Sequence, residues 1–310
     1  MQSLLLKIGS IVRGQIYIDR GYSIKNTILL CGSGRSGTTW VASIINSDNH
    51  FRYMFEPFHP ELVPMVKHFN VRQYLRPSNK EDKFVVPATN IFSGKVRNLW
   101  VDRYNRNIFP RKRLIKDIRI NLILKWIRIN FPQMPIIYML RHPFAVACSR
   151  IRLGWKNHLK DLLKQKELID DLLYKFESLI DGRRIGEFEK QIIFWCIENY
   201  YPMTSFKPGE IYILFYENLY LNPEGEIKGL FNYIGLPIPE SVPKKIRKPS
   251  SMTKKDSPLV TGRDPLLHWK DDLDNRQIDR ALRIMSEFGF DKVYTDGALP
   301  TTEGVDELVR

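Results

Sequence analysis

The sequence predicts an α/β fold in which a P-loop-type parallel sheet is flanked by helices. Apolar runs that are too short for helices alternate along the chain with longer segments whose apolar residues recur at helical spacing. A glycine-rich turn joins the first of these runs to the first helical segment. Strands that alternate with helices pair in parallel through crossover connections, so the pattern favours one sheet covered by helices.

Three apolar runs are predicted as buried strands, a weakly alternating segment as a further strand, and six segments as helices. The expected strands cover 27–31, 51–55, 135–140 and 211–215. The expected helices cover 38–46, 143–153, 158–180, 187–200, 222–234 and 274–288. Residues 57–110 hold Pro, Asn and scattered aromatic residues, which indicates long loops and short helices that form one wall of a site.

The composition is typical of a folded globular protein, with 310 residues of which 43% are hydrophobic and 26% charged. We expect an N-terminal arm or short helix over residues 1–20, a single domain over 21–296 and a loose C-terminal tail over 297–310. The longest uninterrupted apolar stretch has six residues, Ile192–Ile197, whereas a membrane span needs about 20. We therefore expect no transmembrane segment, while the arm is a candidate for peripheral contact with a membrane.

The balance of charge points to an anionic partner. Lys and Arg number 48 and Asp and Glu 34, which gives a net charge of +14. The excess is concentrated in residues 97–128, with ten Lys or Arg and two acids, and in the loop 244–255, with six and none. A nucleotide, an acidic glycan and a nucleic acid all fit such a charge. No nucleic-acid-binding motif accompanies it, so we expect no nucleic-acid partner.

Cysteine and histidine usage argues against disulfides and metal sites. Cys31, Cys148 and Cys196 lie in apolar segments, which indicates small buried side chains in a reducing compartment. The histidines show no metal-ligand spacing, and no HExxH, CxxC or paired-Asp motif occurs. We therefore expect no metal.

The glycine-rich turn Gly32-Ser-Gly-Arg-Ser-Gly37 leaves a buried strand and opens a helix, a context in which backbone N–H groups converge on an anion. The spacing fits the P-loop template, with Thr39 at the Ser/Thr place but Thr38 where the template has Lys. That Lys contacts the β- and γ-phosphates in ATPases and kinases, so a P-loop kinase or NTPase is the less favoured alternative. The turn suits a transferred group of lower charge, such as a sulfuryl group, with Arg35 supplying positive charge.

At Ser33-Gly-Arg-Ser-Gly-Thr-Thr-Trp40 the sequence resembles the 5′-phosphosulfate loop of sulfotransferases that use 3′-phosphoadenosine 5′-phosphosulfate (PAPS). A second stretch resembles the family's 3′-phosphate motif, a strand that ends in Arg141 with Ser149 eight residues later on the next helix. The stretches 215–236 and 248–290 also resemble the family, chiefly its bacterial and carbohydrate-type members. The resemblance covers about residues 26–295.

The resemblance implies a sulfotransferase fold, PAPS as donor and adenosine 3′,5′-bisphosphate (PAP) as product, with no metal. It assigns donor binding to Ser33, Gly34, Arg35, Ser36, Gly37, Thr38, Thr39, Trp40, Arg141, Ser149, Lys248 and Ser250, with Ser251 as an alternative in the basic loop. For Arg141 a structural ion pair is the alternative, and Ser149 can equally be an ordinary helix residue. The basic loop can also be a solvated surface.

Glu56, in Phe55-Glu-Pro-Phe-His59, is the best candidate for a general base because it directly follows a predicted strand. The segment is similar to the Glu-Pro motif of Golgi-type carbohydrate sulfotransferases. The alternative is a carboxylate that simply pairs with nearby cations. His59 is the second candidate base, since other branches of the family use histidine, although a lone loop histidine is more often a surface residue.

Lys116 is the first candidate for neutralising the leaving group, as a lysine does in related glycan sulfotransferases. Its alternative is an ion pair with the adjacent Asp117. Arg35 is the second candidate for that charge.

The function expected from these residues is transfer of a sulfuryl group from PAPS to a carbohydrate hydroxyl on a polysaccharide, an oligosaccharide or a glycolipid. The basic segment 97–128 makes an acidic glycan our guess for the acceptor. A small non-carbohydrate hydroxyl, a kinase or NTPase activity and a non-catalytic nucleic-acid binder are the alternatives. Because the loop starts at residue 32 without a preceding anchor, we expect a cytoplasmic, bacterial-type enzyme.

Overall fold

Five parallel strands form one sheet in the order β2-β3-β1-β4-β5. The structure is a computed structural model that describes residues 12–309 except 20, 177–178, 180–184 and 247–260. The strands are β1 (Thr27–Gly32), β2 (Phe51–Phe55), β3 (Lys112–Asp117), β4 (Ile136–Leu140) and β5 (Tyr212–Phe215). The predicted α/β fold with a parallel sheet flanked by helices is confirmed.

Strand β3 is missing from the sequence prediction because Lys-Arg-Leu-Ile-Lys-Asp carries more charge than a buried strand usually does. In the structure every residue of β3 except Lys112 is buried. Its two buried cations are neutralised at opposite ends: Arg113 contacts Asp19 at 3.1 Å, and Lys116 contacts Glu56 at 2.6 Å. Buried charges are tolerated when they are paired with opposite charges. A strand that contains such pairs lacks a continuous apolar pattern, so it could not be predicted from hydrophobicity.

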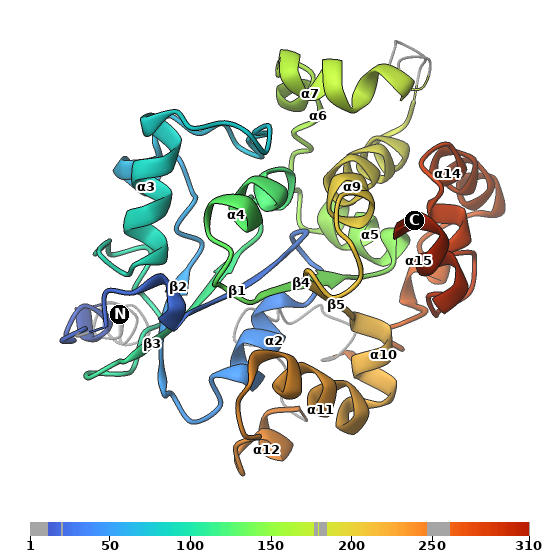
Figure 1. Cartoon of the computed structure of the whole chain (residues 1–310). Coiled ribbons are helices and arrows are strands. Elements are labelled where there is room, and N and C mark those ends of the chain that lie inside the picture. Colours follow the sequence, from blue (N-terminus) through green and yellow to red (C-terminus); the bar gives the residue numbers. More distant parts are fainter. Residues whose placement is uncertain (1–11, 20, 177–178, 180–184, 247–260, 310) are drawn as a thin grey trace, which may run out of the picture.

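Helices cover both faces of the sheet (Figure 1). One face carries α2 (Thr38–Ile45), α11 (Pro223–Ile234) and α12 (Val242–Ile246), and the other α3 (Asp82–Phe92), α4 (Leu124–Asn130), α5 (Pro143–Arg152) and α9 (Glu187–Thr204). The remaining helices are α6 (Leu159–Leu162), α7 (Lys166–Asp171), α10 (Tyr216–Leu221), α14 (Asn275–Glu287) and α15 (Thr302–Val309). Short 3-10 turns are Ile24–Asn26, Pro64–Val66, Asn121–Ile123, Leu173–Phe176, His268–Asp271 and Phe290–Lys292.

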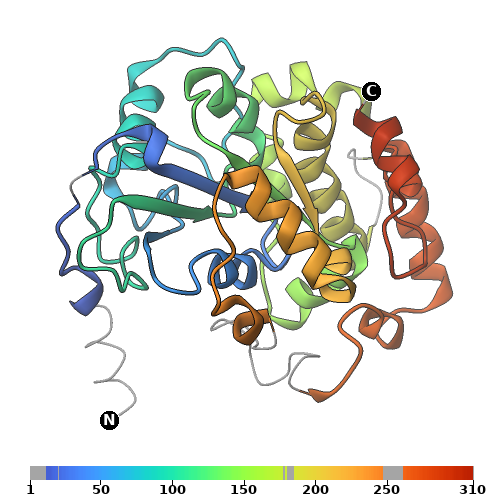
Figure 2. The same cartoon turned by 60° about the horizontal axis from the view of Figure 1, so that its bottom comes forward.

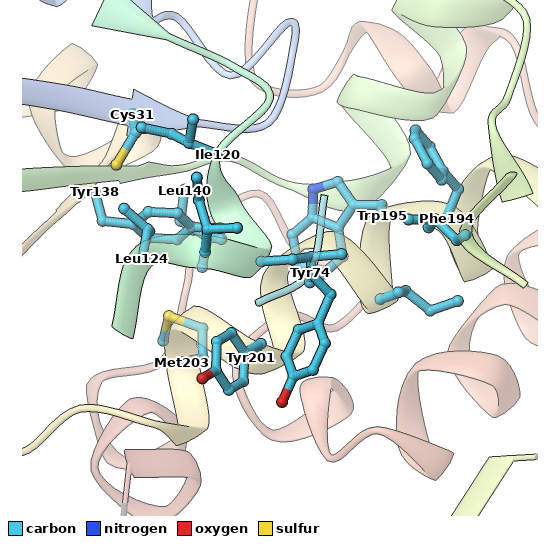
Figure 3. Packing of buried hydrophobic residues seen from close by; sticks show 14 of the residues in the cluster. Cys31, Tyr74, Ile120, Leu124, Tyr138, Leu140, Phe194, Trp195, Tyr201 and Met203 are labelled. Carbon is cyan, nitrogen blue, oxygen red and sulfur yellow. The ribbon is translucent and has the colours of Figure 1, made fainter. Parts of the chain in front are cut away.

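Alternate residues of the buried strands feed two hydrophobic cores, as a pleated strand requires. Leu29 and Cys31 of β1 join the core on the α9 side, whereas Ile28 and Leu30 join the core on the α2 side. Figure 3 shows part of the first core, in which Cys31, Tyr138 and Leu140 of the sheet lie close to Leu124 and to residues of α9. Burial on both faces explains why the central strands are continuous apolar runs.

Two sequence predictions are wrong in detail. The single helix expected over 158–180 is broken into α6, α7 and a 3-10 turn in its described part. The tail expected to be loose over 297–310 contains α15, whose Val305 and Leu308 pack against the larger core.

The three cysteines are buried and free, as their apolar surroundings predict. Among the helices that the structure describes, none is long and apolar enough to cross a bilayer.

Candidate active site

The predicted site residues follow the carboxyl ends of neighbouring strands and therefore share one edge of the sheet. Strand order places Glu56 after β2, Lys116 in β3, the glycine-rich turn after β1 and Arg141 after β4. In open parallel sheets ligands bind at this edge, where the strand order reverses. The turn thus lies between an acid–base pair on one side and a guanidinium on the other.

The glycine-rich turn needs its glycines because neighbouring atoms leave no room for a Cβ at two of them. Gly37 caps α2 with a φ of 96°, and a Cβ there would lie 2.7 Å from a ring carbon of Tyr216. A Cβ on Gly32 would lie 2.3 Å from the carbonyl oxygen of Met139. Arg35 adopts a φ of 79°, which is uncommon for a residue other than glycine and typical of functional loops.

Arg35, Ser149 and Arg141, predicted to bind donor phosphates, do come together. The Nε of Arg35 donates to Oγ of Ser149 at 3.0 Å, and Nη1 of Arg141 donates to the carbonyl of Arg35 at 3.2 Å. The guanidinium of Arg141 lies 4.0 Å from the ring centroid of Tyr216, and its Nη2 donates to the carbonyl of Pro265 at 3.0 Å. Arg141 therefore makes no carboxylate pair among the described residues, contrary to the structural alternative considered for it.

One donor atom of this cluster is unsatisfied. The Nε of Arg141 is buried and has no hydrogen-bond partner among the described residues. A buried polar atom without a partner is costly unless a ligand or water meets it. This orphaned atom fits an anion, because arginine binds phosphate through two parallel hydrogen bonds.

A buried ion-pair network, centred on Glu198, connects the glycine-rich turn to α9. The carboxylate of Glu198 on α9 accepts hydrogen bonds from Ser33 at 3.0 Å, from Arg150 at 2.7 Å and from Arg72. The Nε of Arg150 also reaches the carbonyl of Gly34 at 3.3 Å. Burial alone raises the pKa of Glu198, but Arg150 and Arg72 outweigh it and hold the pKa below its ordinary value. The network ties the turn rigidly to α9.

Glu56 lies in a cage of two cations. Its Oε1 accepts from Nζ of Lys116 at 2.6 Å, and its Oε2 accepts from the guanidinium of Arg119. The residue is 5% exposed and adopts a φ of 46°, a strained backbone conformation. Its N–H continues the sheet pairing by donating to the carbonyl of Lys116 at 2.7 Å.

The cage sets the basicity of Glu56. Burial alone raises the pKa of this carboxyl group, but Lys116 and Arg119 more than cancel that effect and lower the pKa. Glu56 is therefore ionised at neutral pH, the form that a proton acceptor needs. The expected alternative, a carboxylate paired with nearby cations, describes its state in this structure.

Lys116 pairs with Glu56 rather than with Asp117, its expected alternative partner. Asp117 instead accepts the backbone N–H groups of Phe58 and Arg119, each at 2.8 Å. It thereby ties the segment after β2 to the segment after β3, which keeps Glu56 and Arg119 together. Burial raises the pKa of Asp117.

His59 lies close to this cage but is not part of it. Its Nδ1 is buried without a hydrogen-bond partner among the described residues, and its ring contacts Trp100 edge-on at 5.4 Å. Burial, and then the positive charge of Arg119, lower the pKa of His59. Trp100 in turn donates from Nε1 to the carbonyl of Glu56 at 3.3 Å.

The other side chains of the turn face different ways. The hydroxyls of Ser33 and Ser36 point inward, and both the hydroxyl and the N–H of Ser36 donate to the carbonyl of Ser33, at 2.6 and 3.1 Å. Thr38 is buried, Thr39 is partly exposed, and Trp40 contacts Tyr216 edge-on at 5.7 Å. Lys248, Ser250 and Ser251 lie outside the described residues, as does most of the loop 244–255.

Arg119, Trp155, Glu198 and Tyr216 belong to the site but were not identified from the sequence. Arg119 was detectable, because it follows Lys116 by three residues in a basic stretch. The ring centroid of Trp155 lies 6.0 Å from the guanidinium carbon of Arg35. Nothing in the sequence near Trp155 indicates that it belongs to the site. The same holds for Glu198, inside an apolar helix. In the described part of the chain, no three His, Cys, Asp or Glu residues gather as metal ligands would.

Several sulfotransferases are among the solved structures that match the chain, each with a TM-score below 0.5. A mouse sulfotransferase complexed with PAP has a TM-score of 0.47 at 12% identity, with 96% of this chain and 93% of that chain covered. The sulfotransferase domain of the Synechococcus PCC 7002 olefin synthase has a TM-score of 0.45 at 17% identity, with 83% and 93% covered. A sulfotransferase from Mycobacterium avium has a TM-score of 0.45 at 10% identity, with 89% and 79% covered. No curated protein matches the chain significantly.

A family model gives the decisive comparison. The model described as "Sulfotransferase family" matches residues 27–240. This range includes all five strands, Glu56 with its two cations, and Arg141. The chain belongs to the sulfotransferase family and is a sulfotransferase.

Proposed function

We propose that the protein transfers the sulfuryl group of PAPS to a hydroxyl of a carbohydrate, with Glu56 as general base. The observation that carries this proposal is the order of groups along the sheet edge. The glycine-rich turn stands between the Arg141, Arg35 and Ser149 cluster and the caged Glu56. A donor that is anionic at both ends fits this order, with its 3′-phosphate at Arg141 and its sulfuryl group facing β3 and β2.

The donor side is supported by the unsatisfied Nε of Arg141 and by the turn. Arg141 and Ser149 would hold the 3′-phosphate, and the backbone N–H groups of the turn would hold the phosphosulfate at the start of α2. Stacking of Arg141 on Tyr216 keeps its guanidinium oriented toward this edge. When bound, PAPS would supply an activated sulfuryl group with a good leaving phosphate.

The chemistry falls to the caged residues. Glu56 accepts the hydroxyl proton as the acceptor oxygen bonds to sulfur, a step for which a positioned base contributes roughly 10²–10⁴-fold. Lys116 neutralises the phosphate oxygen released when the old S–O bond breaks, with Arg35 as the second source of charge. Because Lys116 contacts Glu56, one ion pair can supply both the base for the acceptor hydroxyl and the positive charge for the leaving phosphate.

His59 remains a second candidate base. The observation in its favour is its buried, unpartnered Nδ1, and its lowered pKa keeps the ring neutral and able to accept a proton. A small non-carbohydrate hydroxyl remains the alternative acceptor. The Glu-Pro motif and the basic segment 97–128 support an acidic glycan instead. We also propose a cytoplasmic location, which the three buried, free cysteines support.

The test combines binding and transfer. Calorimetry should show that the protein binds PAP, and Arg141→Ala should weaken that binding more than about tenfold because it removes a charge-assisted contact. Glu56→Gln should keep PAP binding and lower transfer of labelled sulfate at least about 100-fold. No PAP binding at millimolar concentration would contradict the donor assignment.

The acceptor and the base need their own controls. A panel of acidic and neutral glycans, glycolipids and phenols, with labelled donor, should give the fastest transfer to an acidic glycan. Faster transfer to phenols would overturn the carbohydrate assignment. Full activity of Glu56→Gln together with loss of activity in His59→Asn would move the base to His59.

A further inference from the structure

Six large apolar side chains are exposed on the N-terminal segment and on the loop before β3. They are between 49% and 64% exposed. We call them, with the cations among them, the arm patch: Val12, Ile16, Ile18, Leu99, Ile108 and Phe109. Exposed apolar side chains are ordinary when scattered singly, but a contiguous group marks an interaction surface.

Backbone contacts make the arm patch contiguous. The N–H of Ile18 donates to the carbonyl of Ile108 at 2.8 Å, and Arg97 donates to the carbonyl of Tyr17 at 2.8 Å. Further along, Gln15 reaches the carbonyl of Asn98 at 3.5 Å. Figure 2 shows the N-terminal segment running beside this loop at the left edge of the molecule. The two apolar groups therefore form one surface.

Residues 12–19, the described part of the arm, are held in place by their inward side chains, so their outward apolar face is a stable feature. Tyr17 is buried, and its hydroxyl donates to Asp102 at 3.2 Å. Asp19 is buried and pairs with Arg113 at 3.1 Å. Ile16 and Ile18 alternate with these residues and face solvent. This arrangement reverses the usual one, in which the polar residues of an edge segment face water.

The exposed charged residues within the arm patch are all positive. Its exposed charged residues over 12–19 and 97–112 are Arg13, Arg97, Arg106, Arg111 and Lys112. The acids in these ranges, Asp19 and Asp102, are buried, and both pair with Arg52. At the border of the patch, Asp48 is partly exposed and contacts His50 at 2.8 Å. An anionic partner therefore meets no exposed acid within the patch.

We propose that the arm patch docks the protein on the surface of an anionic lipid bilayer. Exposed aliphatic and aromatic side chains bordered by cations match the boundary between headgroups and acyl chains, where apolar burial and attraction to anionic lipids act together. A soluble polyanion would use the cations and leave six apolar side chains in water. Residues 1–11, which precede the patch, contain five Leu or Ile, one Lys and no acid.

Docking would also place the active site beside the membrane. Leu99 of the arm patch is adjacent to Trp100, whose Nε1 donates to the carbonyl of Glu56 at 3.3 Å. The loop that carries the patch thus leads directly to the rim where transfer is proposed.

Flotation of the full chain with lipid vesicles tests the inference without any measurement of activity. The protein should float with vesicles of about 30% phosphatidylserine in phosphatidylcholine and not with pure phosphatidylcholine, and salt should weaken the binding. Ile18→Ser with Phe109→Ser, and separately Arg106→Gln with Arg111→Gln, should each lower the partition coefficient more than about tenfold. Ile238→Ser with Lys228→Gln changes one exposed apolar and one exposed basic residue outside the patch and should have no effect.

Other outcomes would overturn the inference. Circular dichroism and PAP binding should be unchanged in all variants, so that loss of flotation reports on the surface and not on folding. Failure of the wild-type chain to float would overturn the proposal, as would equal losses in the control variant. Salt-sensitive binding to heparin that ignores Ile18→Ser with Phe109→Ser would point to an acidic polymer. Self-association that this variant abolishes would point to a second copy of the chain.

Discussion

The proposed chemistry depends on Glu56, whose two carboxylate oxygens contact different cations, Lys116 and Arg119. Lys116 is nearly as buried as Glu56, with 4% of its side chain exposed against 6%, whereas Arg119 is 16% exposed. The pKa of Glu56 is lowered first by Lys116 and then by Arg119, which was not identified as a site residue from the sequence.

Removing Arg119 should change the pH dependence of transfer. The lowered pKa of Glu56 places the acid limb of kcat/KM below the ordinary value for glutamate, because the base works only when ionised. Arg119→Gln removes one of the groups that lower this pKa, so the limb should move to higher pH. A pH profile of kcat/KM checks this, with Arg276→Gln, which is exposed on α14, as the matched control. An unchanged limb would contradict the role of Glu56 as base or of Arg119 as the group that tunes it.

Gly37 offers a second test at the same scale. Gly37→Ala should weaken PAP binding more than about tenfold, because the new Cβ meets Tyr216 at 2.7 Å and φ is 96°. A left-handed conformation costs an L-residue about 1–2 kcal/mol. Gly209→Ala is the matched control, since its φ is 84° but no atom lies within 4 Å of the new Cβ. Calorimetry with PAP should separate the two, and equal effects would argue against a steric role for Gly37.

At the scale of elements, the apolar strands and the phosphate turn could be predicted from the sequence, whereas charged elements could not. β1, β4 and β5 are apolar runs, β2 alternates weakly around Arg52, and the turn between β1 and α2 matches a template with known spacing. β3 was not predicted as a strand because its buried charges pair with residues from distant segments. Contacts such as Glu56 with Arg119 and Ser33 with Glu198 join residues 63 and 165 positions apart, and a single sequence carries no signal for such pairings.

The link between the turn and α9 predicts a large loss of stability in Glu198→Gln. The substitution leaves Arg72 and Arg150 buried without a counter-charge, which costs about 3–5 kcal/mol. Because the folded-state pKa of Glu198 is lowered, its contribution is present above the unfolded-state pKa and is lost as pH falls through the folded value. Urea unfolding at neutral and acidic pH should show both effects. Glu240→Gln, at an exposed position outside the helices, should change the unfolding free energy by less than about 0.5 kcal/mol.

At the scale of the whole molecule, two surfaces hold part of the positive charge that gives the net value of +14. One part surrounds the carboxyl edge of the sheet, through Arg35, Lys116, Arg119 and Arg141. The other part lies in the arm patch, beside the segment that begins β3. The basic segment 97–128 contributes to both, which explains why its composition alone predicts an anionic partner but not which one.

The arm should contribute to global stability without touching donor binding. Asp19→Asn leaves Arg113 with a neutral partner and should lower the unfolding free energy by about 3 kcal/mol, because both side chains are buried. The start of β3 lies roughly 15–20 Å from its end, since a strand rises about 3.3 Å per residue. PAP affinity should therefore change by less than about twofold. Denaturation and calorimetry on the same samples check this, and a large loss of PAP affinity at unchanged stability would contradict it.

The charged strand β3 has a consequence for how the chain selects its pairing. Leu114 and Ile115 are its only large apolar residues, so hydrophobicity alone would tolerate a slip against β1 or β2. A slip of one residue would turn Arg113 and Lys116 to the opposite faces of the sheet, away from Asp19 and Glu56, and bury two unmatched cations. A slipped register is thus electrostatically unfavourable at both ends of the strand, and the ion pairs of Arg113 and Lys116 favour the native register as well as holding Asp19 and Glu56 in place.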